Sequence, residues 1–270
     1  MQAIISLLSA HKDWLVLTGA GVSAASGVPT YRNSDAVWQR KPPVTHQEFM
    51  AEQSSRRRFW SRNMVGWRFM IDAQPNSAHL ALVKLQQLGL VSCLVTQNVD
   101  GLHQRAGSKA VIDLHGRIDS VSCMACGHKY SRASLQTWLE TQNPEYAFLA
   151  GGIAPDGDAD IDHLDYSDMQ VPDCEHCGGI LKPDAVFYGD SVPKDRLMLA
   201  EQKLQQAKGL VVAGSSLMTY SGYRFCLWAQ QQGKPILLLN EGKTRADDIA
   251  TLKIGGSCAE VLQGWLAAAG

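Results

Sequence analysis

The sequence has no hydrophobic run that approaches the roughly 20 residues of a membrane-spanning helix. It also lacks the basic segment followed by an apolar stretch that marks a secretory signal. The formal net charge is only −1, so no excess of charge favours nucleic acid or an anionic membrane surface as a partner. These absences predict a cytoplasmic protein that binds neither. Apolar residues make up 45% of the 270 residues, which is enough for one large domain with a sizeable core.

Disulfides are not expected, although the sequence contains seven cysteines. Four of them form two Cys-x-x-Cys pairs, Cys123 with Cys126 and Cys174 with Cys177, and each pair is followed by glycine. In a chain that is not secreted, this spacing favours a metal site. Four thiolates suit tetrahedral Zn²⁺ at about 2.3 Å and leave no open position for a substrate. The sequence therefore predicts one structural zinc ion.

A run of small residues follows the first apolar segment of the chain. Trp14–Leu17 is a continuous apolar run, typical of a buried parallel strand, and Gly19-Ala20-Gly21 comes soon after it. A strand, a glycine-rich turn and the start of a helix form an anion site, because the backbone can approach a phosphate closely. The chain is therefore predicted to begin with a dinucleotide-binding unit. The spacing is not a G-x-G-x-x-G pattern, so a tight turn without a ligand stays open as the alternative at this point.

Apolar runs and amphipathic stretches alternate along the rest of the chain. Further strands are predicted at 91–96, 111–114, 209–213 and 235–239. Helices are predicted at 2–11, 46–72, 77–88, 131–141, 194–207 and 220–232, with a last helix after Cys258. The segment 33–45 has no periodicity and is predicted to be a long loop.

Polar and small residues follow several of these predicted strands. Gln97-Asn98-Val99-Asp100 ends the second strand and His115 the third, whereas Gly214-Ser215-Ser216 and Asn240-Glu241-Gly242 end the last two. Open α/β sheets bind their ligands at the carboxyl ends of the strands. Amide and carboxylate side chains there can bind a carboxamide and ribose hydroxyls, but each segment alone is equally compatible with an ordinary polar turn.

Together these segments resemble the sirtuins, the NAD-dependent protein-lysine deacylases. The resemblance rests on five motifs in the family's order and covers nearly the whole chain. They are Gly-Ala-Gly-x-Ser-x-x-Ser-Gly-x-Pro-x-x-Arg from Gly19 to Arg32, Thr96–His103, Leu114-His115-Gly116, the two cysteine pairs, and Gly214-Ser215-Ser216. One departure is Thr30, where the family usually has aspartate, which puts in doubt any hydrogen bond made by that carboxylate.

The resemblance implies an α/β fold in which a Rossmann-like parallel sheet is interrupted by a helical module and a zinc-binding module. The whole chain, 1–270, would be one catalytic domain. Its NAD-binding core would comprise 1–45, 75–120 and 182–270, with the helical module at 46–74 and the zinc module at 121–181.

The resemblance also implies roles for individual residues. His115 matches the general base, and Asn98 and Asp100 match the catalytic pocket around nicotinamide and its ribose. Val186, Phe187 and Gly189 match the segment that binds the acyl-lysine peptide. The expected contacts to NAD are Gly19, Ala20, Gly21, Thr30, Tyr31, Arg32, Gln97, Asn98, Asp100, Gly214, Ser215, Ser216, Asn240, Glu241, Gly242 and Cys258.

The implied reaction consumes NAD as a co-substrate. The acyl oxygen attacks C1′ of the nicotinamide ribose, and nicotinamide leaves. His115 then accepts a proton from the ribose hydroxyls, and the acyl group passes to ADP-ribose. The partners would be acyl-lysine proteins, and a monomer is plausible.

Acyl specificity is the least determined property. Sirtuins that remove acidic acyl groups carry Tyr-x-x-Arg in the helical module, and the nearest match here is Phe59 with Arg62. We expect both side chains to line the acyl pocket, with no sharp preference for succinyl-lysine. The insertion between the cysteine pairs resembles class II sirtuins, so protein ADP-ribosyltransferase or lipoamidase activity is the alternative. Its aspartates at 156–162 fail the EF-hand pattern and are predicted to form a solvated acidic loop.

Two functions outside this family stay open on sequence grounds. A nicotinamide dehydrogenase usually has an acidic residue at the end of its second strand, about 20 residues after the glycines, but that interval here is loop. A zinc-ribbon nucleic-acid binder should show a basic face, whereas the segments around the cysteines, such as 173–179, are acidic or neutral.

Overall fold

A six-stranded sheet forms the centre of the molecule. The computed structural model describes residues 2–38, 43–147, 149, 152–153, 158–161 and 164–269. The strand order is β11-β10-β9-β1-β2-β3, and every pairing is parallel, so the predicted Rossmann-like sheet is confirmed. The strands are β1 (Trp14–Thr18), β2 (Val91–Thr96), β3 (Val111–Asp113), β9 (Gly209–Ala213), β10 (Ile236–Leu239) and the unpredicted edge strand β11 (Leu252–Ile254).

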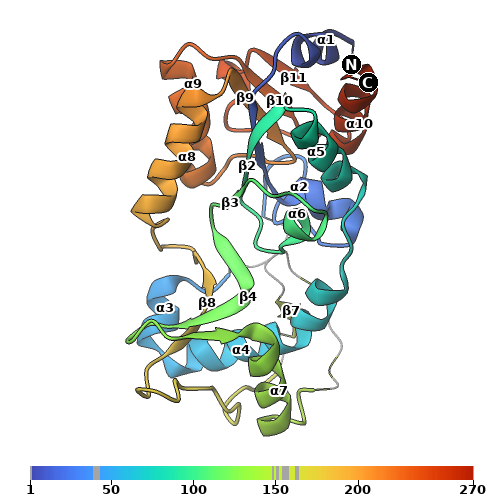
Figure 1. Ribbon diagram of the computed structural model, residues 1–270. Coiled ribbons are helices and arrows are strands. Elements are labelled where there is room, and N and C mark those ends of the chain that lie inside the picture. Colours follow the sequence, from blue (N-terminus) through green and yellow to red (C-terminus); the bar gives the residue numbers. More distant parts are fainter. Residues whose placement is uncertain are drawn as a thin grey trace.

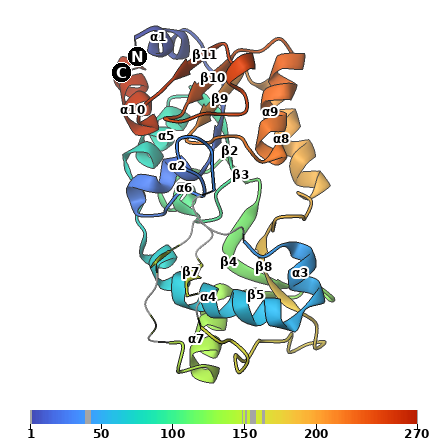
Figure 2. The same ribbon diagram turned by 180° about the vertical axis from the view of Figure 1, so that it is seen from behind.

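Helices cover both faces of this sheet (Figures 1 and 2). One face carries α1 (Gln2–Ser9), α5 (Ser77–Gln87) and α10 (Cys258–Ala269), and the other carries α8 (Lys194–Gln206) and α9 (Tyr220–Gln231). Because side chains alternate along a strand, Trp14 and Val16 point to the first face, and Leu15 and Leu17 to the second. This double burial explains why the central strands are continuous apolar runs.

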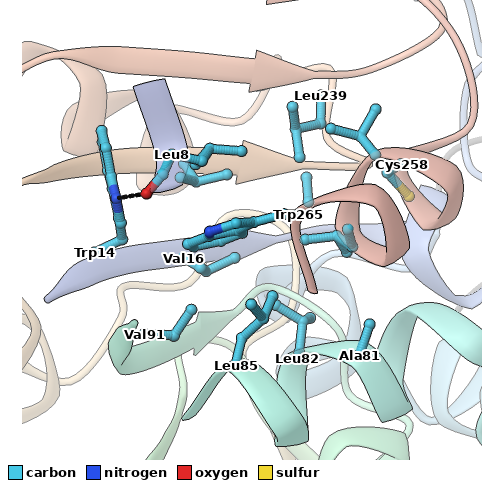
Figure 3. Close-up of a cluster of buried hydrophobic side chains, with 14 of the residues drawn as sticks. Leu8, Trp14, Val16, Ala81, Leu82, Leu85, Val91, Leu239, Cys258 and Trp265 are labelled. Carbon is cyan, nitrogen blue, oxygen red and sulfur yellow. Dashed lines mark hydrogen bonds between the residues drawn. The ribbon is translucent and has the colours of Figure 1, made fainter. Parts of the chain in front are cut away.

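The core on the α1 face is built around two tryptophans. Trp14 and Trp265 are fully buried, and the Trp14 indole N–H donates to the carbonyl oxygen of Leu8, 3.1 Å away. Figure 3 shows Trp265 of α10 gathered with Val16 of β1 and Leu82 of α5. These contacts join both ends of the chain to the first strand and so fix the position of the loop that follows it.

A second lobe lies below the large sheet in Figure 1. It contains α3 (His46–Ala51), α4 (Gln53–Asp72), α7 (Arg132–Gln142) and the antiparallel sheet β5-β4-β8 (Lys129–Ser131, Gly116–Cys123, Leu181–Ala185). The predicted helix at 46–72 is divided at Glu52, whose backbone is extended. A capping box between Thr45 and Glu48 begins α3. The described chain also contains α2 (Ala20–Ser23), α6 (Leu102–Arg105), the 3₁₀ helices η1 (Ala24–Ser26) and η2 (Asp247–Ile249), and the short pair β6 (Gly152–Ile153) and β7 (Ala159–Asp160).

Parts of two predicted loops lie outside the described residues, namely 39–42 of the loop at 33–45, and 156–157 with 162 of the acidic stretch. Among the described residues, no helix has the length and apolar content that crossing a membrane requires.

Candidate active site

A cavity of about 1200 Å³ lies at the carboxyl ends of the central parallel strands. Its walls on this side are the segments after β1, β2, β9 and β10. Residues 30–34 and 186–192 complete the lining, and the latter segment follows β8 of the second lobe. The cavity is therefore lined both by polar strand ends of the large sheet and by a segment that leaves the second lobe.

The loops after β1 and β9 touch through their backbones. The amide of Gly21 donates to the carbonyl oxygen of Gly214 at 2.8 Å, and a Cβ added to Gly21 would lie 2.8 Å from the Gly214 Cα. Gly214 also has a φ of +61°, which favours glycine. Glycine at both positions lets the two loops form one continuous floor for the cavity.

Ser23 joins the polar residues that follow β2. Its hydroxyl donates to the Asp100 carboxylate at 2.7 Å and accepts from the Asn98 side-chain amide at 3.0 Å. The other Asp100 oxygen accepts from the Leu102 amide at 2.9 Å. Asn98 and Asp100 are thus held side by side at the cavity wall. Ser23 is the serine of the Gly-Ala-Gly-x-Ser motif, but the sequence alone assigned it no role.

His115 lines the same cavity and is hydrogen-bonded at both ring nitrogens. Nδ1 lies 2.9 Å from the Gln97 carbonyl oxygen, and Nε2 lies 2.8 Å from the Ser221 hydroxyl. A carbonyl oxygen only accepts, so Nδ1 carries the proton in the neutral ring and Nε2 holds the lone pair. Burial lowers the pKa of His115 to about 4, helped by the positive charge of Arg196 and opposed by the bond to Gln97. The imidazole is therefore neutral at pH 7 and can accept a proton.

The other residues predicted to contact NAD or the peptide also line this cavity. Thr30 donates to the Arg32 carbonyl oxygen at 3.0 Å, and the Arg32 guanidinium lies over the Trp38 ring at 4.1 Å. Sequence reasoning missed Trp38 and Tyr188, whose ring centres are 5.5 Å apart at the cavity wall. The predicted residues that join the lining are Ala20, Thr30, Tyr31, Arg32, Gln97, Ser215, Ser216, Asn240, Glu241, Gly242, Cys258, Val186, Phe187 and Gly189.

Phe59 and Arg62 do not line this cavity, and their place in an acyl pocket stays a prediction. Phe59 is buried and packs against the rings of Phe49 and Phe187, at centre distances of 5.2 and 5.1 Å. Arg62 is buried too, and its Nε donates to the Ala159 carbonyl oxygen at 3.0 Å. Helical spacing put the two side chains on one face of α4, but tertiary contacts direct them to different neighbours.

Asp158 supplies the charge next to Arg62. One of its carboxylate oxygens lies 3.8 Å from the Arg62 Nε, and Asp158 is only 2% exposed. The prediction of a solvated acidic loop is therefore wrong for this residue. A buried arginine needs an opposite charge and hydrogen-bond acceptors, and the inserted segment provides both.

The four cysteines of the two Cys-x-x-Cys pairs form a separate cluster in the second lobe. All four sulfurs lie within 4.8 Å of one another, with 3.5 Å between Cys123 and Cys177 and 3.7 Å between Cys126 and Cys174. Tetrahedral zinc with sulfurs at about 2.3 Å separates those sulfurs by about 3.8 Å, so the cluster fits one structural zinc ion. The glycine after each pair has a positive φ, which closes each turn around the metal position.

The main cavity fits NAD by its chemistry and its place in the fold. Dinucleotides bind at the carboxyl edge of such sheets, against glycine loops that allow close approach to phosphate. The amide of Asn98 and the carboxylate of Asp100 can bind a carboxamide and ribose hydroxyls. Asn240 and Glu241 offer similar groups after β10, at the other end of the same edge.

Known proteins resemble this chain over almost its full length. An NAD-dependent protein deacetylase of Bordetella bronchiseptica is 51% identical over 262 residues, which cover 97% of this chain and 96% of the relative. The bovine NAD-dependent protein lipoamidase sirtuin-4, mitochondrial, is 43% identical over 265 residues, covering 97% of this chain and 83% of the relative.

Solved structures agree with this similarity. A variant Sir2 protein with a deacetylated p53 peptide and 3′-O-acetyl-ADP-ribose has a TM-score of 0.79 at 30% identity, covering 99% of this chain and 97% of that chain. Sir2 with a p53 peptide and NAD⁺ has a TM-score of 0.74 at 32% identity, covering 97% and 95%. The Sir2 family profile matches residues 19–221. The chain therefore belongs to the Sir2 family, the sirtuins.

Proposed function

We infer that this chain is an NAD-dependent protein deacetylase. It transfers the acetyl group of acetyl-lysine to ADP-ribose and releases nicotinamide. The observation that carries this conclusion is a neutral imidazole, His115, held in the same cavity as Asn98 and Asp100. The relative from Bordetella bronchiseptica, named an NAD-dependent protein deacetylase, supports the same activity.

In this proposal the whole chain is one catalytic domain. The large sheet with its helices, approximately 1–45, 75–120 and 182–270, binds NAD. The helical module, 46–74, and the zinc module, 121–181, form the second lobe. The cavity wall at 186–192 supports a role in binding the acyl-lysine peptide, because this segment joins the two lobes and faces the strand ends.

NAD, when bound, supplies the electrophilic ribose carbon and the hydroxyls that receive the acyl group. His115 acts as the general base, since its Nε2 lone pair can accept a ribose hydroxyl proton near pH 7. Asn98 and Asp100, braced by Ser23, orient the nicotinamide and its ribose. The zinc ion does not take part in the chemistry, because four thiolates leave it no open position.

The test is a mass balance with purified protein, NAD and an acetyl-lysine peptide. We expect equal amounts of free nicotinamide, deacetylated peptide and O-acetyl-ADP-ribose, measured by mass spectrometry. Nicotinamide release without deacetylated peptide would contradict the proposal. Formation of NADH, seen by its absorbance, in place of nicotinamide release would contradict it too. A protein or peptide mass increase by one ADP-ribose would instead support the transferase alternative.

Lipoamidase activity is the second candidate, and the bovine relative with that name favours it. The two activities differ only in the acyl group, so a lipoyl-lysine peptide of identical sequence is the matched substrate. A higher kcat/KM on lipoyl-lysine than on acetyl-lysine would make lipoamidase the better description. A cytoplasmic location and a monomeric state stay predictions of the sequence.

A further inference from the structure

Ser221 makes a direct hydrogen bond to the imidazole that is proposed as the base. It is the second residue of α9, and its hydroxyl oxygen lies 2.8 Å from the His115 Nε2. Because the Gln97 carbonyl oxygen fixes the proton on Nδ1, the Ser221 hydroxyl donates to the Nε2 lone pair. The ring is thus held from both sides, by a backbone acceptor on one and by a side-chain donor on the other.

The first turn of α9 also contacts Gln97, whose carbonyl oxygen binds the other ring nitrogen of His115. The Thr219 hydroxyl donates to the Gln97 side-chain oxygen at 3.3 Å, and the Gln97 amide donates to the Ser215 hydroxyl at 2.8 Å. A Cβ added to Gly222 would lie 2.3 Å from the same Gln97 oxygen. This close approach fixes the separation between α9 and the end of β2, and His115 lies between them.

We propose that Ser221 is a positioning residue for His115, which keeps Nε2 turned toward the cavity as the proton-accepting nitrogen. Neutral imidazole has two tautomers and two ring orientations, and only some of them present a lone pair to the reacting hydroxyl. A serine hydroxyl both donates and accepts. It therefore donates to the single Nε2 lone pair in the resting enzyme, and the ribose hydroxyl has to replace it there before its proton passes to the ring. The Ser221 oxygen can then accept from protonated Nε2 as the substrate moves away. The inference rests on the proposed function, in which His115 is the base.

Three variants test this role. Ser221→Ala removes the hydroxyl, and Ser221→Thr keeps it. Ser92→Ala deletes an exposed hydroxyl on β2 that does not line the cavity, and serves as the matched control. Zinc content and thermal unfolding of all three are measured first, so that a folding defect is recognised.

The first readout needs no substrate. Nitrogen NMR of protein with isotopically labelled histidine reports which ring nitrogen carries the proton, and the His115→Asn spectrum identifies the His115 signals. We expect wild type, Ser221→Thr and Ser92→Ala to show the proton on Nδ1 alone. Ser221→Ala should keep the proton on Nδ1, which Gln97 fixes, but its Nε2 signal should shift or broaden, because the ring has lost the donor that holds its orientation. An unchanged spectrum in Ser221→Ala would overturn the proposal.

The second readout is kinetic. We expect Ser221→Ala to lower kcat for deacetylation about tenfold, because a badly oriented base loses only part of the rate that a general base contributes. KM for NAD should change less than about twofold. Ser221→Thr should retain most of kcat. Wild-type kcat in Ser221→Ala, or equal losses in the Ala and Thr variants, would overturn the positioning role. A wild-type protein without NAD-dependent deacetylation would contradict the proposed function instead, and the NMR comparison would still decide whether Ser221 holds the ring through Nε2.

Discussion

The imidazole rings of His79 and His103 lie with their centres 4.7 Å apart, and both are buried. The His79 Nδ1 accepts from the Asn76 amide at 3.2 Å, and the His103 Nε2 lies 2.9 Å from the Thr18 hydroxyl. Burial lowers the pKa of His79 to about 4, and burial with the nearby His79 lowers the pKa of His103 well below its usual range. Both rings are therefore neutral in the folded protein.

This arrangement predicts loss of stability in mild acid. Below pH 6.5 the unfolded chain protonates His79, His103 and His115, whereas the folded chain protonates His79 and His115 only near pH 4 and keeps the pKa of His103 well below its usual range. The free energy of unfolding should therefore fall as pH drops from 6.5 toward 4, by at most about 1.4 kcal/mol per pH unit for each group. Urea unfolding at several pH values measures this slope. It should become less steep in His79→Gln and stay unchanged in His11→Gln, an exposed control; equal slopes in all three would contradict the prediction.

His115→Ala tests the proposed base. Deacetylation should fall by about 100-fold or more, because a general base contributes at least that factor. NAD affinity should change little, since Asn98, Asp100 and the glycine loops are left intact. Calorimetry measures NAD binding, and peptide mass spectrometry measures turnover. Wild-type turnover in this variant would remove His115 from its role.

Cys174→Ser tests the zinc site. Three thiolates and a hydroxyl bind zinc more weakly than four thiolates, and metal binding is coupled to folding of the lobe around it. We expect zinc content to fall below one ion per chain and the melting temperature to fall by about 5 °C or more. Elemental analysis and thermal unfolding on the same sample measure both. Carefully purified wild-type protein without zinc would contradict the assignment.

The large sheet was predictable because its strands are buried on both faces. β1, β9 and β10 are continuous apolar runs of four or five residues between turns, which is the length of a strand and too short for a helix. The second lobe gave no such signal. β4 mixes buried and partly exposed residues and pairs with β8 across the long insertion, so its strand character depends on a remote partner.

The site residues also divide into those that local sequence indicates and those that depend on remote partners. Asn98, Asp100 and His115 could be singled out because they follow predicted strands and match sirtuin motifs, and the parallel sheet brings those strand ends to one edge. Ser23 and Ser221 were not, because the contacts that give them meaning are with residues 77 and 106 positions away. For Phe59 and Arg62, a place in an acyl pocket stays a prediction. Their helical spacing indicated a common face, but the distant Asp158 and the Phe187 ring determine where each side chain lies.

Phe59→Tyr tests whether Phe59 of α4 lines an acyl pocket or packs inside the second lobe. If Phe59 faced an acyl chain, the new hydroxyl would bind a terminal carboxylate, and activity on succinyl-lysine would rise relative to acetyl-lysine. In the structure Phe59 is 7% exposed and packs among the rings of Phe49, Trp60 and Phe187. The carbon atoms of these rings do not accept a hydrogen bond from a hydroxyl. Burying it there should lower the free energy of unfolding by about 1–3 kcal/mol.

We therefore expect Phe59→Tyr to lower stability and to leave the ratio of the two kcat/KM values unchanged. The reason for the unchanged ratio is Arg62, whose guanidinium already contacts Asp158 and the Ala159 carbonyl oxygen inside the lobe. Urea unfolding gives the first quantity, and matched succinyl and acetyl peptides give the second. Phe69→Tyr, at a more exposed ring on the same helix, is the control for adding a hydroxyl to α4. A raised succinyl ratio at unchanged stability would mean that Phe59 turns toward the acyl chain when substrate binds, and would return this pair to the specificity pocket.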